Sequence, residues 1–192
     1  PVFSPFKDIY CKSLEEAETQ YKVQDVVGWE GEMLRRFKPL VVIDHDVQGE
    51  YGHGVHRLNT YCLMKALPAA ADDTAYPESR DRYGTWDTPK CYLHMRDENN
   101  RLMDWDQPLS AFGGKTGYEM AAKGFLCHAS QQNGHHEMSK KGRRDCRSFG
   151  LYRSLVGEDT QMNDFLEHTP QSLFAPASTT AAETTTALQT TT

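Results

Sequence analysis

Carboxylate and imidazole side chains are concentrated in one short stretch of the chain, residues 44–56. They are Asp44, His45, Asp46, Glu50, His53 and His56. Carboxylates that follow a buried strand can hold Mg²⁺ together with water, and imidazole is a common ligand of zinc and iron. The stretch therefore predicts a divalent-metal site with Asp44, Asp46 and His53 as ligands, which would serve a small metal-dependent hydrolase. His45, His53 and His56, with Glu50, could instead form a transition-metal site, to which His135 and His136 could add further imidazoles.

The run Val42-Ile43-Asp44-His45-Asp46 also resembles the first motif of the haloacid-dehalogenase phosphatases. In that family the two aspartates serve as nucleophile and acid, which would give these roles to Asp44 and Asp46. The resemblance covers one strand. It implies several further parallel strands, with a Thr or Ser and a Lys at later strand ends. The acidic pair Asp72-Asp73 follows a run of alanines and not a strand.

Two later stretches carry weaker signals. Gly113-Gly114-Lys115-Thr116 is similar to part of a phosphate-binding loop, but the full pattern needs glycine at the position of Leu109. A glycine turn that leads into a helix explains the same residues by geometry alone. The basic run 140–144 is either a docking patch for phosphate, RNA or an acidic partner, or a solvated loop.

The elements that must position these residues indicate an α+β fold, mostly short helices with a small β element. A buried strand is expected near 40–44, where aliphatic residues follow Pro39, and a hairpin near 91–105, around a polar turn. Helical spacing and capping patterns predict the helices, with a long polar connection over 69–90. The expected helices are 13–28, 29–37, 55–67, one from Thr116, one over 149–156 and one from Thr160.

Length and composition favour one compact domain with polar extensions. Of the 192 residues, 1–12 form an extended arm, 13–168 the α-rich domain and 169–192 a Thr- and Ala-rich tail. The net charge of -6 argues against general nucleic-acid binding. The five cysteines include no CxxC pair, which favours a reducing intracellular compartment, and Cys62 and Cys127 are expected in the core. No apolar run is long enough for a transmembrane segment.

The tail suggests a function of its own, because a Thr- and Ala-rich segment has no core to bury and would become ordered only on a partner. The expected contacts are Ser178, Thr179, Thr180, Thr184, Thr185 and Thr186. With the arm, the tail would bind other protein subunits. This interpretation makes the chain a non-catalytic accessory subunit without a cofactor, most readily a peripheral subunit of a mitochondrial, respiratory-type membrane complex. The metal-dependent hydrolase is the alternative.

Overall fold

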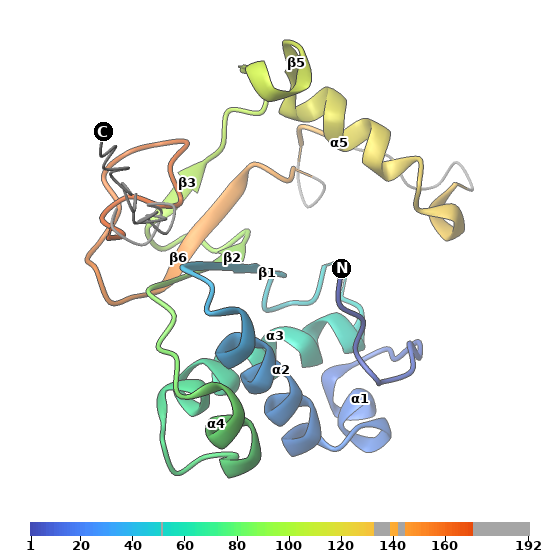
Figure 1. Cartoon of the computed structure of the whole chain (residues 1–192). Helices are drawn as coiled ribbons and strands as arrows, with labels where there is room; N and C mark the ends of the chain where they lie inside the picture. Colours follow the sequence, from blue (N-terminus) through green and yellow to red (C-terminus); the bar gives the residue numbers. More distant parts are fainter. Residues whose placement is uncertain (51, 133–138, 142–144, 171–192) are drawn as a thin grey trace, which may run out of the picture.

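The structure of the protein is a computed structural model that describes residues 1–50, 52–132, 139–141 and 145–170. Helices of the first half of the chain form a layer beneath a small mixed sheet, and a further helix, α5 (Gly117–Phe125), lies on the far side of the sheet (Figure 1). The predicted α+β class is confirmed. The tail residues predicted to bind a partner lie outside the described residues, as do His135 and His136 and part of the basic run 140–144.

The helical layer consists of α1 (Leu14–Gln20), α2 (Val23–Phe37), α3 (Gly54–Ala71) and α4 (Pro77–Tyr83). Ser13 begins α1 as predicted, since its hydroxyl accepts a hydrogen bond from the amide of Glu16 at 3.2 Å. The expected helix 13–28 is in fact two helices, because the chain is extended at Tyr21 and Lys22. Apolar side chains of α2 and α3 then make the main core, namely Val26, Val27, Leu34, Leu58, Cys62, Leu63, Ala66 and Leu67.

Arg35 of α2 is 1% exposed, and its guanidinium determines how α3 ends. It donates hydrogen bonds to the backbone carbonyls of residues 69, 70, 72, 75 and 76 and to the hydroxyl of Ser79. The last carbonyls of a helix lack partners within it, so a buried guanidinium with five donors suits this position. The expected helix 55–67 was predicted to end too early, since α3 continues to Ala71. The expected irregular connection over 69–90 contains α4.

The sheet consists of β1 (Val41–Asp44), β2 (Lys90–His94), β6 (Ser148–Ser154) and β3 (Asn100–Leu102), in that order. β1 is parallel to β2, and β6 is antiparallel to both β2 and β3. The strands of the predicted hairpin exist, but the prediction that they pair directly with each other was wrong, because β6 lies between them. A helix was predicted over 149–156, where β6 stands. Phe149, Tyr152 and Val156 have helical spacing, but so short a run does not separate helix from strand.

β1 lies at the edge of the sheet, and Ile43 is 46% exposed. The strand expected near 40–44 is present, but it is therefore not buried as predicted. Within the described residues β1 has one parallel neighbour, which differs from the parallel sheet that the phosphatase resemblance implies. A second correction concerns the cysteines: Cys62 is buried as expected, whereas Cys127 is exposed.

A separate hairpin leads into α5 (Gly117–Phe125). It pairs β4 (Pro108–Leu109) with β5 (Lys115–Thr116), and a 3-10 turn (Ser110–Phe112) connects them. Gly113 and Gly114 both have positive φ, and the amide of Gly114 donates to the carbonyl of Leu109 at 3.0 Å. The glycines thus serve the turn. The predicted capping box of Thr116 and Glu119 is present at the start of α5.

A buried ion pair holds the segment after β6 against the sheet. Lys90 and Asp159 have fully buried side chains in direct contact, and the hydroxyl of Tyr92 donates to the same carboxylate. Thr160 begins no helix. Instead, its amide and hydroxyl donate to Glu167, which closes the loop between them. In the ranges that the structure covers, no helix has the length and hydrophobicity needed to cross a membrane.

Candidate active site

The histidine-rich stretch lies where β1 and β2 end side by side. Because the two strands are parallel and Asp44 is paired with Leu93, the residues that follow, His45 and His94, lie at the same edge of the sheet. The loop after β1 returns Glu50 to this edge, and α3 begins just beyond it. The fold therefore brings residues of four segments together: β1, the loop 45–53, the first turn of α3 and β2.

Glu50 and His94 form the firmest contact of the site. Nδ1 of His94 lies 2.5 Å from Oε1 of Glu50, and Nε2 lies 2.9 Å from the carbonyl oxygen of Asp145. A carboxylate and a carbonyl both only accept hydrogen bonds, so both ring nitrogens carry protons and His94 is a cation. Burial opposes that charge, but the bonds to Glu50 and Asp145 outweigh it and raise the pKa of His94. Burial also opposes the charged form of Glu50 and would raise the pKa of this carboxyl group, but its interactions with His45 and His94 lower that pKa.

Three more imidazoles adjoin this pair. The rings of His45 and His56 are stacked, with centroids 4.6 Å apart, and those of His53 and His56 are also 4.6 Å apart. Nδ1 of His45 lies 3.8 Å from Oε1 of Glu50, and this interaction raises the pKa of His45. The pKa of His56 is lowered, first by burial and then by the charges of His45 and His53. The pKa values of the two stacked rings are therefore shifted in opposite directions, which is the relation expected between an acid and a base of one site.

Asp44, Asp46 and His53, the predicted metal ligands, are placed as follows. Oδ1 of Asp44 accepts from the side chain of Asn59 at 2.8 Å, and Oδ1 of Asp46 accepts from the amide of Gln48 at 2.9 Å. His53 is the residue before α3. Within the described ranges no three His, Cys, Asp or Glu side chains stand ready to hold a metal ion. Oδ2 of Asp44 and Nδ1 of both His53 and His56 are nevertheless buried without a hydrogen-bond partner, which suits donor atoms of a ligand set.

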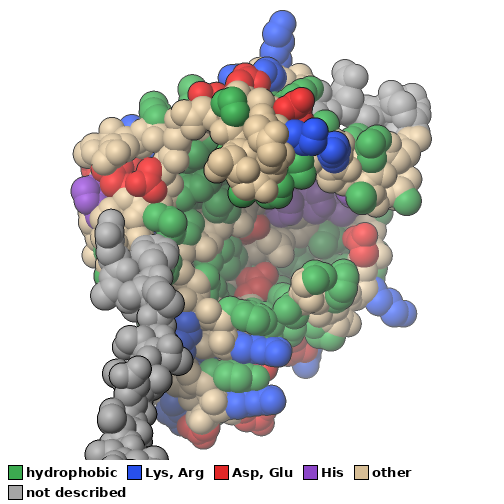
Figure 2. All heavy atoms as spheres, turned by 45° about the horizontal axis from the view of Figure 1, so that its top comes forward, with side chains coloured by type: hydrophobic (Ala, Val, Ile, Leu, Met, Phe, Trp, Pro, Cys, Tyr) green, Lys and Arg blue, Asp and Glu red, His purple; other side chains and the backbone are tan. Residues whose placement is uncertain are grey.

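His94 is the member of the site that the sequence did not point to. It stands alone in its stretch of the chain, and only the parallel pairing of β1 with β2 brings it to Glu50. Histidine side chains gather in the wall of a hollow on the face seen in Figure 2, with acidic side chains deeper in it. Imidazole and carboxylate side chains in the wall of a hollow are groups that can accept and donate protons.

The chain matches no protein-family profile. A 61-residue stretch, 32% of the chain, is 43% identical to the 1D-myo-inositol 2-acetamido-2-deoxy-α-D-glucopyranoside deacetylase 2 of Saccharopolyspora erythraea. Over 60 residues, 31% of the chain, it is 38% identical to the corresponding deacetylase of Rhodococcus erythropolis. Over 79 residues, 39% of the chain, it is 35% identical to the mycothiol S-conjugate amidase of Streptomyces coelicolor. The matches cover 21%, 19% and 26% of these relatives' own lengths, respectively.

These relatives overturn the interpretation as a non-catalytic accessory subunit. All three carry the names of enzymes that cleave an amide or remove an acetyl group, and all three come from bacteria, which also contradicts the mitochondrial location. The error came from the weight given to the tail, whose composition says how it behaves alone but nothing about a partner.

Proposed function

We propose that this chain contributes to the hydrolysis of an N-acyl bond, with an N-acetylated amino sugar as the substrate class. The stacked pair His45 and His56, with pKa values shifted in opposite directions beside Glu50, is the observation that supports the proposal most directly. The names of the three partial relatives support the choice of an amide over other bonds.

The proposed reaction uses the two imidazoles in complementary roles. His56, uncharged near neutral pH, accepts a proton from the attacking water as it adds to the amide carbonyl carbon. His45, held as a cation by Glu50, stabilises the negative charge on the carbonyl oxygen and then gives a proton to the nitrogen that leaves. The C–N bond breaks, and the products are the free amine and the carboxylic acid, which loses its proton to solvent. His94 has both ring nitrogens bonded, so its role is to hold Glu50 in position.

A divalent metal ion at Asp44, Asp46 and His53 also remains a proposal. The buried, unpartnered atoms of Asp44 and His53 support it, whereas Asp46 already has a backbone partner. Such an ion supplies Lewis-acid polarisation of a carbonyl and a bound water of lowered pKa. Elemental analysis of the wild-type protein and of the double variant Asp44→Asn/Asp46→Asn would test it: the proposal expects stoichiometric metal only in the wild type.

The function is tested by release of acetate from 1D-myo-inositol 2-acetamido-2-deoxy-α-D-glucopyranoside. We expect His56→Asn to reduce the rate by about 10²- to 10⁴-fold, the usual contribution of a general base. His128→Asn is the matched control, because His128 is exposed and lies outside the cluster. Equal rates for the wild type and His56→Asn would contradict the assignment. A wild-type rate no faster than the uncatalysed reaction would contradict the function for this chain as it stands.

Protein partners are a separate proposal. Residues 1–12 would contact another protein chain, since Val2, Phe3 and Tyr10 are 49%, 84% and 70% exposed. The net charge of -6 favours a protein over nucleic acid. Site-specific photo-cross-linking from position 3 would test this, and the absence of any cross-linked protein would contradict it.

A further inference from the structure

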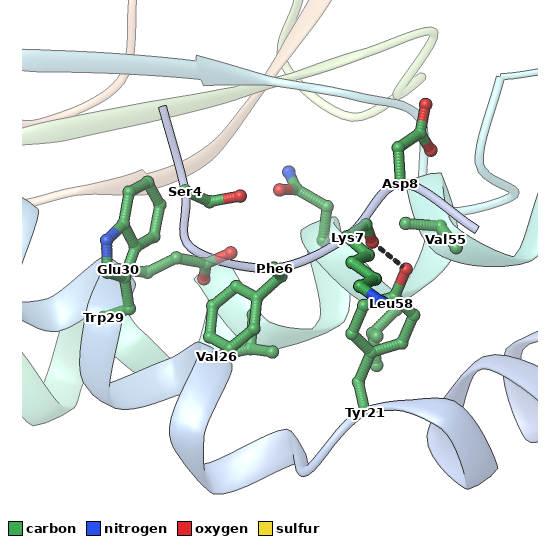
Figure 3. A pocket seen from close by; sticks show the side chains of 11 residues that line it. Ser4, Phe6, Lys7, Asp8, Tyr21, Val26, Trp29, Glu30, Val55 and Leu58 are labelled. Carbon is green, nitrogen blue, oxygen red and sulfur yellow. Dashed lines mark hydrogen bonds between the residues drawn. The ribbon is translucent and has the colours of Figure 1, made fainter. Parts of the chain in front are cut away.

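A cavity of about 180 Å³ lies between the N-terminal segment, α2 and α3, and no histidine lines it. Figure 3 shows residues 4–8 crossing over it as a strap, with side chains of α2 and α3 beneath. Its lining is mostly apolar and aromatic: Phe6, Tyr21, Val26, Trp29, Val55 and Leu58, with Ser4, Lys7, Asp8, Glu30 and Asn59 as the polar members.

Glu30 is the unusual member of this lining. It is 8% exposed, and its Oε2 is buried without a hydrogen-bond partner. A buried carboxyl oxygen without a donor is costly, and native proteins rarely leave one so. Burial, with a smaller contribution from Asp44, raises the pKa of Glu30 to about 9. The carboxyl group extends toward the strap beside Phe6 (Figure 3), so a molecule in the cavity could reach it.

Aromatic rings form the walls around this carboxyl group. Phe6 packs edge-on against both Trp29 and Tyr21, with centroids 6.4 Å apart in each pair. The hydroxyl of Tyr21 donates to the carbonyl of Lys7 at 2.5 Å and so holds the strap over the cavity. The strap has no regular secondary structure, and the side chain of Phe6 packs against the core beneath it.

We propose that this cavity binds a small organic ammonium compound, whose ammonium group donates to Glu30 and whose apolar part lies among Phe6, Val26 and Trp29. A donor satisfies the unpartnered oxygen, and a cation gains further from nearby aromatic rings. Asp8 in the lining and Asp44 near Glu30 also favour a positive charge, while Lys7 partly offsets them. An anion would meet the negative charges of Asp8 and Asp44 and is disfavoured.

The test is a titration of the full chain with n-butylammonium, followed by NMR at the indole N–H of Trp29. 1-Butanol, similar in size but uncharged, is the matched ligand. Glu30→Gln is the test variant, and Glu18→Gln, on the exposed side of α1, is the matched control. We expect n-butylammonium to saturate the wild type and Glu18→Gln at millimolar concentration. Glu30→Gln should bind n-butylammonium at least tenfold more weakly, and the wild type should bind 1-butanol at least tenfold more weakly.

Three results would overturn the proposal. The first is a wild-type spectrum that does not change up to about 100 mM ligand, two orders of magnitude above the expected dissociation constant. The second is equal binding of n-butylammonium and 1-butanol. The third is binding of n-butylammonium by Glu30→Gln that is as tight as in the wild type. If Glu30→Gln does not fold, Phe6→Ala is the second variant. It opens the strap side of the cavity without touching Glu30, and binding as tight as in the wild type would then contradict the aromatic part of the site.

Discussion

The imidazole rings of His45 and His56 lie parallel, with an angle of 3° between their planes and 4.6 Å between their centroids. Two cationic rings at that distance repel each other, so protonation of one opposes protonation of the other. Glu50 decides which ring keeps the proton, because it lies beside His45. The pKa values of the two rings are therefore shifted apart, and Glu50 is the first cause of the upward shift at His45.

Replacing Glu50 with Gln should remove that arrangement. The pKa values of His45 and His94 should both fall, because each is raised by Glu50, and NMR titration of the ring protons would measure this. The loss of stability should be about 3 kcal/mol, typical of breaking a mostly buried pair.

The pH dependence of that loss follows from the directions of the shifts. Glu50 has a lowered pKa, so its contribution is lost as pH falls below its ordinary value of 4.5. His94 has a raised pKa, so its contribution is lost as pH rises through that raised value, above the ordinary 6.5. Urea unfolding should show the largest difference between these limits. A difference that does not vary with pH would contradict the ion pair.

Glu30→Gln should stabilise the protein increasingly toward alkaline pH. The folded-state pKa of Glu30 is about 9 against an ordinary 4.5, so the wild type loses stability as pH rises between these values. The gain of the variant over the wild type should grow by up to about 1.4 kcal/mol per pH unit in that window. Thermal unfolding of both proteins between about pH 5 and pH 9, roughly the range between the two pKa values, measures this gain in stability. Glu18→Gln should follow the wild type throughout.

The buried pair of Lys90 and Asp159 should be costly to break from one side. Lys90→Met leaves the Asp159 carboxylate buried with Tyr92 as its remaining side-chain donor, and we expect a loss of about 3–5 kcal/mol in urea unfolding. Adding Asp159→Leu should recover part of it. Lys140→Met, which breaks an exposed pair with Asp106, should cost less than about 1 kcal/mol. Equal effects of Lys90→Met and Lys140→Met would contradict the buried network.

Arg35→Lys should loosen the end of α3. A lysine has three donors and cannot reach all the carbonyls that the guanidinium satisfies, so the loss should be about 3 kcal/mol. The amide of Asp72, bonded to the carbonyl of Pro68, should exchange its hydrogen faster. Arg36→Lys is the matched control on the exposed side of α2. If both variants exchange alike, the guanidinium does not hold this helix end.

Local patterns predicted the helices better than the sheet. Ser13 and Thr116 start helices as their capping residues predict, because a cap depends on residues within one turn. Pairing of β2 with β6 joins residues such as Leu93 and Gly150 that are far apart in sequence, and no local pattern encodes it. The same holds for Arg35: its burial and its acceptors on residues 69–79 depend on how α2 packs on α3.

The candidate site was predictable in part, since His45, Glu50, His53 and His56 stand in one stretch of sequence. The sequence shows that these residues are close together along the chain, but not which side chains they contact in the fold. The sequence selected Asp44 and Asp46 as the acidic members because they flank His45, whereas in the structure Glu50 is the carboxylate between two imidazoles. His94 enters the site only through the register of two parallel strands, a relation that exists once the sheet has formed.

The position of β6 between β2 and β3 has a consequence for how the protein is made on the ribosome. β2 and β3 emerge early, and each must wait for residues 148–154 before its antiparallel partner exists. Gly150 then fits closely against β2's end, since a Cβ there would lie 2.5 Å from the carbonyl oxygen of Arg96. The edges of β2 and β3 that pair with β6 thus stay unpaired while more than forty further residues are synthesised. At ordinary rates of translation this takes roughly two to nine seconds. In that interval the nascent chain is open to pairing with other chains.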